Sequence, residues 1–391
     1  MTPIYLDCNA STPIAPEVRE AMLPYLTHHY GNPSSQHWAG VPARAAVEQA
    51  RSQVAALLGC SPEEIVFTSG GTEANNQALK GVFFALHDRG DHIITTRIEH
   101  PAILSPCRFL ERLGARVTYV GVDRTGLVSP DDIRRVITPR TILVSVMHAN
   151  NEVGTIQPVG EIGRIAREHG ILFHTDAAQS VGKIATRVDD LGIDLLSVAG
   201  HKLYAPKGVG ALYIRVGMKL EPLMHGAGHE QGRRAGTENV LLDVGLGAAC
   251  ELAQDIGWTA RVQALRDRFW DALQAAFGES VVLNGHPVKR LPNTLNVSFI
   301  GQIGSDILGR MPQVAASTGS ACHSGKIELS PVLQAMGIQP EVGLGAIRFS
   351  LGRMTTWEEL ETTEYLLQSA IRGNRRFPPP QDCRKTPGGK H

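Results

Sequence analysis

Residues 171–215 read ILFHTDAAQSVGKIATRVDDLGIDLLSVAGHKLYAPKGVGALYIR and carry the clearest sign of the fold. They contain three short apolar runs, ILFHTDA, LLSVAG and GALYIR, separated by polar or glycine-rich segments. Continuous runs of this length, rich in leucine, isoleucine and valine, are typical of strands that are buried on both faces of a sheet. We therefore expect three strands here, with polar residues placed just beyond their ends.

The same pattern extends toward the N-terminus, where four further apolar runs occur between residues 65 and 150: IVFTSG, HIITTRI, RVTYVGV and TILVSVMHAN. Helical stretches such as TEANNQALKGVFFALHD and PAILSPCRFLERLG separate the earlier runs. Strands that alternate with helices form βαβ units, so the sequence predicts an α/β fold with a mostly parallel, seven-stranded sheet flanked by helices. In such sheets, ligands bind beyond the carboxyl ends of the strands.

The C-terminal part has a different pattern. Residues 240–277 read as a long helical stretch in two parts, followed by the strand LPNTLNVSF, the glycine- and serine-rich loop STGSACHSG and a last strand, AIRFSL. A final helix begins near Thr356, whose predicted cap is completed by Glu359 three residues on. We expect a large domain over 15–255, a smaller α+β domain made of 1–14 and 256–375, and a disordered tail over 376–391.

Composition narrows the class of protein. The 391 residues include 38 Lys and Arg and 38 Asp and Glu, so the net charge is zero and a nucleic acid or an acidic membrane is not the expected partner. No run of 18 apolar residues predicts a membrane span, and the N-terminus has no secretory signal pattern. The six cysteines are scattered without a CxxC pair, which favours a cytoplasmic protein without disulfides.

Three polar segments follow strands of the predicted sheet. Ser69–Asn76 places two glycines at the start of a helix, where backbone N–H groups can bind a phosphate, although a simple turn capped by Thr72 explains it equally well. His174–Gln179 ends a strand with Asp176, which could merely cap the next element. Ser197–Gly210 places Lys202 after another buried strand, where its side chain could also reach solvent.

Together, the three segments match the needs of pyridoxal phosphate. This cofactor requires an amine for a Schiff base, a carboxylate for its ring nitrogen and a site for its phosphate. Lys202, Asp176 and the turn at Gly71 and Thr72 supply these groups in one sheet. A metal site is not predicted, because the glycines between His225 and His229 prevent a helical pair of ligands.

The chain resembles the NifS-like cysteine desulfurases, which are fold-type I pyridoxal-phosphate enzymes. The resemblance covers nearly the whole sequence and rests on motifs in the family's order: YLDCNASTP, GGTEANN, EHPAIL, HANNEVG, HTDAAQ, AGHKLYAPKGVG, GRRAGTENV, LPNTLNVSF, GSACHS and IRFSLGRMTT. It implies the fold of those enzymes and a homodimer, since Thr237 matches a residue that reaches the phosphate bound by the neighbouring subunit.

The resemblance also implies roles for individual residues. Lys202 matches the lysine that carries the cofactor, and His100 matches a histidine that stacks on its ring and moves protons. Arg348 matches the residue that binds the substrate carboxylate, a task for which a planar guanidinium is suited. The remaining matches bind the cofactor, and for Asn151 also the substrate: Gly71, Thr72, Asn151, Asp176, Gln179, Ser197 and His201.

Cys322 matches the nucleophile of the family. It lies in a glycine- and serine-rich loop, and a neighbouring cation such as His323 would favour its thiolate. The resemblance implies that L-cysteine is converted to L-alanine while its sulfur moves to Cys322 as a persulfide. The persulfide then passes to an acceptor protein, such as an iron–sulfur scaffold or a component of thio-modification. The role of Cys8, which lies within the motif YLDCNASTP, stays open, because the N-terminal segment of the family runs close to the active site.

Three alternatives remain at this point. The loop sequence ACHS, followed by SPVL, also resembles selenocysteine lyases, which release selenium from L-selenocysteine. An aminotransferase would share the cofactor residues, but the cysteine in its loop argues against that reaction. A catalytically silent scaffold for sulfur transfer would not require the set formed by Lys202, Asp176, Cys322 and Arg348.

Overall fold

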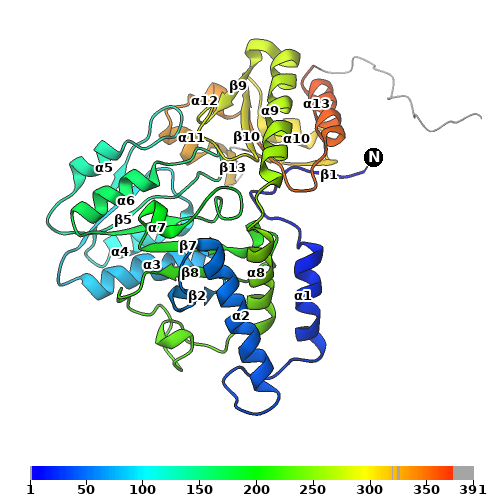
Figure 1. Cartoon of the computed structure of the whole chain (residues 1–391). Helices are drawn as coiled ribbons and strands as arrows, with labels where there is room; N and C mark the ends of the chain where they lie inside the picture. Colours follow the sequence, from blue (N-terminus) through cyan, green and yellow to red (C-terminus); the bar gives the residue numbers. More distant parts are fainter. Residues whose placement is uncertain (1, 319, 324–325, 373–391) are drawn as a thin grey trace, which may run out of the picture.

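The computed structural model of the chain describes residues 2–318, 320–323 and 326–372 (Figure 1). Its large sheet has seven strands in the order β2-β8-β7-β6-β5-β3-β4. Neighbouring strands from β7 to β4 run parallel, whereas β8 is antiparallel to both β7 and β2. The predicted mostly parallel, seven-stranded sheet is therefore confirmed. The strand bounds are β2 Ile65–Thr68, β3 His92–Thr96, β4 Arg116–Val120, β5 Thr141–Ser145, β6 Leu172–Asp176, β7 Leu195–Ala199 and β8 Gly210–Ile214.

Helices cover both faces of this sheet. On β7, Leu195 belongs to the core formed with α3 and α4, and Leu196 belongs to the core formed with α2, α6 and α8. Because both faces are apolar, each strand reads as an unbroken hydrophobic run. The helix bounds are α1 Pro16–Thr27, α2 Gly40–Leu58, η1 Pro62–Glu64, α3 Gly71–Leu86, α4 Pro101–Glu111, α5 Pro130–Val136, α6 Val159–Glu168, α7 Val188–Leu191, η2 Gly200–Lys202, η3 Glu230–Gly232 and α8 Val240–Leu252.

A second, antiparallel sheet has the strand order β12-β15-β10-β9, with α9 and α13 beside it (Figure 1). Ile4 and Leu6 from the N-terminal segment join the core of this sheet. The domain boundaries at 15 and 255 stay predictions. The bounds are β1 Ile4–Tyr5, α9 Trp258–Phe277, η4 Gly278–Ser280, β9 Val281–Asn284, β10 Thr294–Phe299, α10 Gly304–Gly309, β11 Val314–Ala315, β12 Ser317–Thr318, β13 Ser320–His323, β14 Lys326–Leu329, α11 Pro331–Ala335, α12 Pro340–Gly343, β15 Ala346–Ser350 and α13 Trp357–Arg372.

Local capping agrees with the sequence at one helix and differs at another. At α13, the Thr356 N–H donates to Glu359 Oε2 and the Glu359 N–H donates to Thr356 Oγ1, so the predicted capping box is present. At α3, the cap is Gly70, with φ of 146°, and Thr72 lies within the first turn. The possible role of Thr72 as a cap is therefore wrong. None of the described helices combines the length and the apolar composition that a membrane span requires.

The core of the second sheet provides a test of the fold. Phe269 of α9 and Phe349 of β15 are fully buried and meet edge to face, with ring centroids 5.3 Å apart. We expect Phe269→Ala to lower the free energy of unfolding by about 3–5 kcal/mol, because it removes a large buried side chain and leaves a cavity. Urea unfolding followed by circular dichroism measures this loss. The control Phe84→Ala changes a side chain that is 42% exposed and should lower the free energy of unfolding by less than about 1 kcal/mol. Equal losses in the two variants would contradict the placement of Phe269 in the core.

Candidate active site

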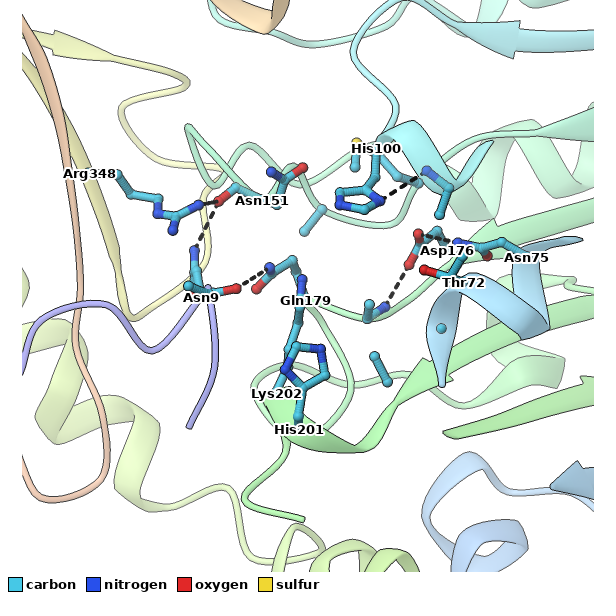
Figure 2. A pocket seen from close by; sticks show the side chains of 17 residues that line it. Asn9, Thr72, Asn75, His100, Asn151, Asp176, Gln179, His201, Lys202 and Arg348 are labelled. Carbon is cyan, nitrogen blue, oxygen red and sulfur yellow. Dashed lines mark hydrogen bonds between the residues drawn. The ribbon is translucent and has the colours of Figure 1, made fainter. Parts of the chain in front are cut away.

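A cavity of about 390 Å³ lies at the carboxyl ends of the central strands, and Figure 2 shows the side chains around it. Its walls come from the ends of β6 and β7, the first turn of α3, the start of α4, the loop after β5, the N-terminal segment and β15. The structure brings together most of the residues predicted to form the site: Gly71, Thr72, His100, Asn151, Asp176, Gln179, His201, Lys202 and Arg348.

Asp176 is the negative charge of the cavity. It ends β6 and is only 7% exposed. Its Oδ1 accepts from the Ala178 N–H at 2.9 Å, and its Oδ2 accepts from Asn75 Nδ2 at 2.7 Å (Figure 2). A buried carboxylate needs such donors to stay charged. The two hydrogen bonds also fix the carboxylate in one orientation at the cavity wall.

Lys202 lies in η2, just beyond the end of β7. Within the described residues its Nζ forms no hydrogen bond or ion pair. Burial lowers the pKa of Lys202, an effect that the negative charge of Asp176 partly offsets. The amine therefore releases its proton more readily than an exposed lysine, as a nucleophile or a base must.

His100 caps α4, and its Nδ1 accepts from the Ala102 N–H at 3.1 Å. Burial lowers the pKa of His100, and the charge of Lys202 lowers it further. Because Nδ1 is an acceptor, the proton of the neutral ring lies on Nε2. His201 lies on the other side of the cavity, where burial lowers its pKa to about 4. Both rings are therefore neutral at physiological pH.

A chain of amides connects the cavity to the N-terminal segment. Gln179 Nε2 donates to the Asn9 carbonyl at 3.0 Å, and Asn9 Nδ2 donates to the Asn151 carbonyl at 3.3 Å (Figure 2). Asn151 Oδ1 is buried without a hydrogen-bond partner in the described part of the chain. An unpaired buried acceptor is costly, and it indicates a place where a bound group would donate.

Arg348 is the positive charge at the other end of the cavity. It lies on β15 and is 8% exposed. Its Nη1 donates to the Asn151 carbonyl at 2.9 Å, and its Nη2 forms an ion pair with Asp7 Oδ1 at 2.7 Å. Arg348 is therefore neither free nor a surface ion pair, and its guanidinium is held in a defined place.

The structure differs from the prediction at Ser197. This residue is fully buried within β7, and its hydroxyl hydrogen-bonds His174 Nε2 at 3.1 Å, so it does not line the cavity. Ala199, two residues further along the strand, occupies the wall instead and has no polar side chain. The prediction that Ser197 binds the cofactor phosphate is wrong, since its hydroxyl is used inside the sheet.

Three other features singled out in the sequence are not among the described residues that line this cavity. Thr237 is exposed and lines a separate hollow of about 170 Å³, together with Ser69 and Gly208. Cys322 lies on β13, but its side chain and that of His323 are outside the described residues. His225 and His229 hydrogen-bond two different carboxylates, those of Glu221 and Glu238.

Three residues in or beside the site are not indicated by the sequence motifs: Asn75, Lys183 and Asp7. Asn75 is four residues after Gly71 on α3, a spacing that places both on one helix face and could have indicated its position. Lys183 Nζ donates to Gln179 Oε1 at 3.1 Å, which fixes the orientation of that amide. Asp7 contacts Arg348 across 341 residues of sequence, and no local pattern signals such a contact.

The family model described as aminotransferase class-V matches residues 4–362 of the chain. The chain belongs to the class-V aminotransferase family. The resemblance and the fold inferred from the sequence are thereby confirmed.

Within this family, the relatives of the chain place it among the cysteine desulfurases. The cysteine desulfurase IscS of Dictyoglomus turgidum is 49% identical over 383 residues, which cover 96% of each chain. A solved NifS-like protein is 37% identical with a TM-score of 0.89, covering 95% of this chain and 100% of the other. A structure described as SspA in complex with cysteine is 39% identical with a TM-score of 0.81, and the match covers 90% of this chain and 100% of the other.

Pyridoxal 5′-phosphate is the cofactor of this member of the class-V aminotransferase family, and the residues around the cavity fit it. The amine of Lys202 has no partner among the described residues, and Asp176 supplies a fixed carboxylate. The first turn of α3 presents Gly71 and Thr72 at the wall, where backbone N–H groups favour a phosphate. The unpaired Asn151 Oδ1 gives a further point of contact for a bound molecule.

The buried Lys183 beside Gln179 predicts a pH dependence of stability. Burial lowers the pKa of Lys183 to about 7, from an ordinary value of 10.5. Below pH 7, the folded protein must keep this ammonium buried and is destabilised. Between about pH 7 and 10.5 the unfolded chain binds the proton that the folded one has lost, so stability rises with pH.

We expect Lys183→Met to remove this dependence. Melting temperatures across pH 6–10 should show the variant at its greatest advantage near pH 6, with the difference moving in favour of the wild type as the pH rises. The exposed Lys289→Met is the matched control and should give no such trend. A constant difference between wild type and Lys183→Met would contradict the predicted titration.

Proposed function

We propose that the chain is a pyridoxal-phosphate-dependent cysteine desulfurase, which converts L-cysteine to L-alanine and transfers the sulfur to Cys322. The observation that carries this proposal is the placement of Lys202, Asp176 and Arg348 around one cavity, in a chain whose relatives are cysteine desulfurases. Together these residues provide an amine, a fixed carboxylate and a binding group for the substrate carboxylate.

Each residue around the cavity has a separate role in the proposed reaction. The bound cofactor supplies an electron sink for the bond broken at the substrate Cα. The fixed carboxylate of Asp176 would keep the ring nitrogen of the cofactor protonated, and Arg348 would bind the substrate carboxylate at the far end of the cavity. Lys202 Nζ, whose pKa is lowered by burial, accepts the Cα proton. His100 donates or accepts protons at Nε2, since its Nδ1 is occupied by the Ala102 N–H.

Sulfur transfer requires a thiolate, and Cys322 supplies it. The Cys322 sulfur attacks the substrate sulfur, so an S–S bond forms while the C–S bond of the substrate breaks. The electron pair of the C–S bond stays on Cβ, which takes up the proton lost by the Cys322 thiol. The products are L-alanine and a Cys322 persulfide, and no further oxidant or reductant is needed.

The partners of the enzyme follow from the same proposal. The persulfide passes to an acceptor protein in iron–sulfur cluster assembly or thio-modification. The enzyme acts as a homodimer in the cytoplasm. Support for the dimer comes from Thr237, which is exposed and faces a hollow separate from the Lys202 cavity of its own chain. Support for a reducing compartment comes from the free thiols Cys8, Cys60, Cys107 and Cys250.

The role of Cys322 is tested by substitution. We expect Cys322→Ser to lower alanine formation from L-cysteine by roughly three orders of magnitude or more, because the nucleophile is lost. Quantified alanine and alkylation of the persulfide measure the effect. Cys60→Ser, at a half-buried thiol, is the control and should change the rate by less than about twofold. Full selenium release from L-selenocysteine by Cys322→Ser, with no alanine from L-cysteine in the wild type, would favour a selenocysteine lyase.

Subunit complementation tests the shared site. Lys202→Ala homodimers should be inactive, and Thr237→Val homodimers should bind the cofactor about ten- to hundredfold more weakly, because a charge-assisted hydrogen bond to phosphate is lost. A mixed dimer of the two variants regains one intact site. That site combines Lys202 of the Thr237→Val subunit with Thr237 of the Lys202→Ala subunit. Cofactor binding with wild-type affinity at half the sites is the expected result. Its absence in purified mixed dimers would place Thr237 outside the neighbouring site.

A further inference from the structure

Arg348, the residue proposed to bind the substrate carboxylate, already holds a carboxylate of the chain itself. Its Nη2 donates to Asp7 Oδ1 at 2.7 Å and to Ser317 Oγ at 2.9 Å. Ser317 Oγ also donates to the same Asp7 oxygen at 2.8 Å, which closes a triangle of three side chains. The side chains of Arg348 and Asp7 are 10% and 19% exposed, so water screens their attraction only in part.

The backbone holds Asp7 in this position. Asp7 pairs with Ser350 of β15 in an isolated bridge, two residues beyond Arg348. On either side of Asp7, the Cys8 N–H donates to the Ser350 carbonyl at 3.0 Å and the Ser350 N–H donates to the Leu6 carbonyl at 2.7 Å. The ion pair is therefore built into the strand pairing and does not depend on a chance meeting of two flexible side chains.

The two sides of the guanidinium serve different groups. Arg348 lines the cavity, whereas Asp7 and Ser317 do not, so the carboxylate of Asp7 approaches from behind the cavity wall. Arg348 Nη1 carries two N–H groups, and only one of them has an acceptor within the described residues, the Asn151 carbonyl. The second N–H of Nη1 is thus left for a ligand carboxylate, which would share the guanidinium with Asp7. Two carboxylates around one cation repel each other, and each weakens the hold of the other.

We propose that Asp7 sets the affinity of Arg348 for the substrate carboxylate, as a positioning residue that orients the guanidinium and offsets part of its charge. This inference rests on the proposed function, in which Arg348 binds the carboxylate of L-cysteine. Asp7 then keeps the binding of substrate and product weak enough for release. The group it recognises is a ligand carboxylate, so an uncharged amide in the same place does not feel Asp7.

The test compares two ligands on the holoenzyme. L-alanine carries the carboxylate, and L-alaninamide replaces it with a neutral amide; titration calorimetry gives both dissociation constants. Asp7→Asn keeps an oxygen that accepts from Arg348 and Ser317 but removes the charge. We expect it to bind L-alanine about three- to tenfold more tightly and L-alaninamide unchanged. The KM for L-cysteine should fall by a similar factor, with kcat altered less.

Two controls separate charge from structure. Ser317→Ala keeps the Asp7 charge and should not tighten L-alanine binding. Asp190→Asn removes a carboxylate from the exposed Arg187–Asp190 pair and should change the dissociation constant of neither L-alanine nor L-alaninamide. Asp7→Ser, which also lacks the charge, replaces Asp7→Asn if that variant does not fold, with the same direction expected.

Unchanged L-alanine binding in the Asp7 variant, or equal changes for both ligands, would overturn the inference. Neither result bears on the proposed function, because that function is tested by alanine and persulfide formation in the wild type. A wild type that makes neither product would instead refute the function.

Discussion

The buried charge of Asp176 is the constraint on which the site depends. A carboxylate that is 7% exposed is unfavourable unless donors and cations surround it. The fold meets this need with the Ala178 N–H, the Asn75 amide and the nearby Lys202. These groups come from the loop after β6, from α3 and from η2 after β7, so the charge is stable only where a parallel sheet brings those segments together. The register of Asp176 opposite Ser197 places β6 and β7 side by side at that edge.

Much of the large sheet could be predicted from the sequence, because a strand covered on both faces must be apolar throughout. The same rule makes part of the site predictable, because polar residues that follow such runs fall at one edge of the sheet. Those residues are Lys202, Asp176 and the turn at the start of α3. The depth of a residue within a strand is harder to predict. Ser197 and Ala199 share a face, yet they lie about 6–7 Å apart along the strand, and only Ala199 reaches the cavity.

Contacts between distant segments could not be predicted. Asp7, Asn9 and Arg348 meet because the N-terminal segment pairs with β11 and with Ser350, and neither pairing leaves a periodic signal in the sequence. Lys183 orients the Gln179 amide through a buried hydrogen bond between residues four apart in sequence. Their segment is not a regular helix, so no helical periodicity indicates this contact. These residues position the side chains that the motifs identify, and only the tertiary structure reveals them.

In the proposed reaction, sulfur moves from L-cysteine to Cys322 as alanine forms. The most direct measurement is a single turnover of the holoenzyme with L-cysteine that carries a heavy sulfur isotope, in the absence of an acceptor, followed by peptide mass spectrometry. We predict heavy sulfur on the peptide that contains Cys322, with one equivalent of alanine for each labelled site. Alanine without label on that peptide, or label on another cysteine, would refute transfer of sulfur to Cys322.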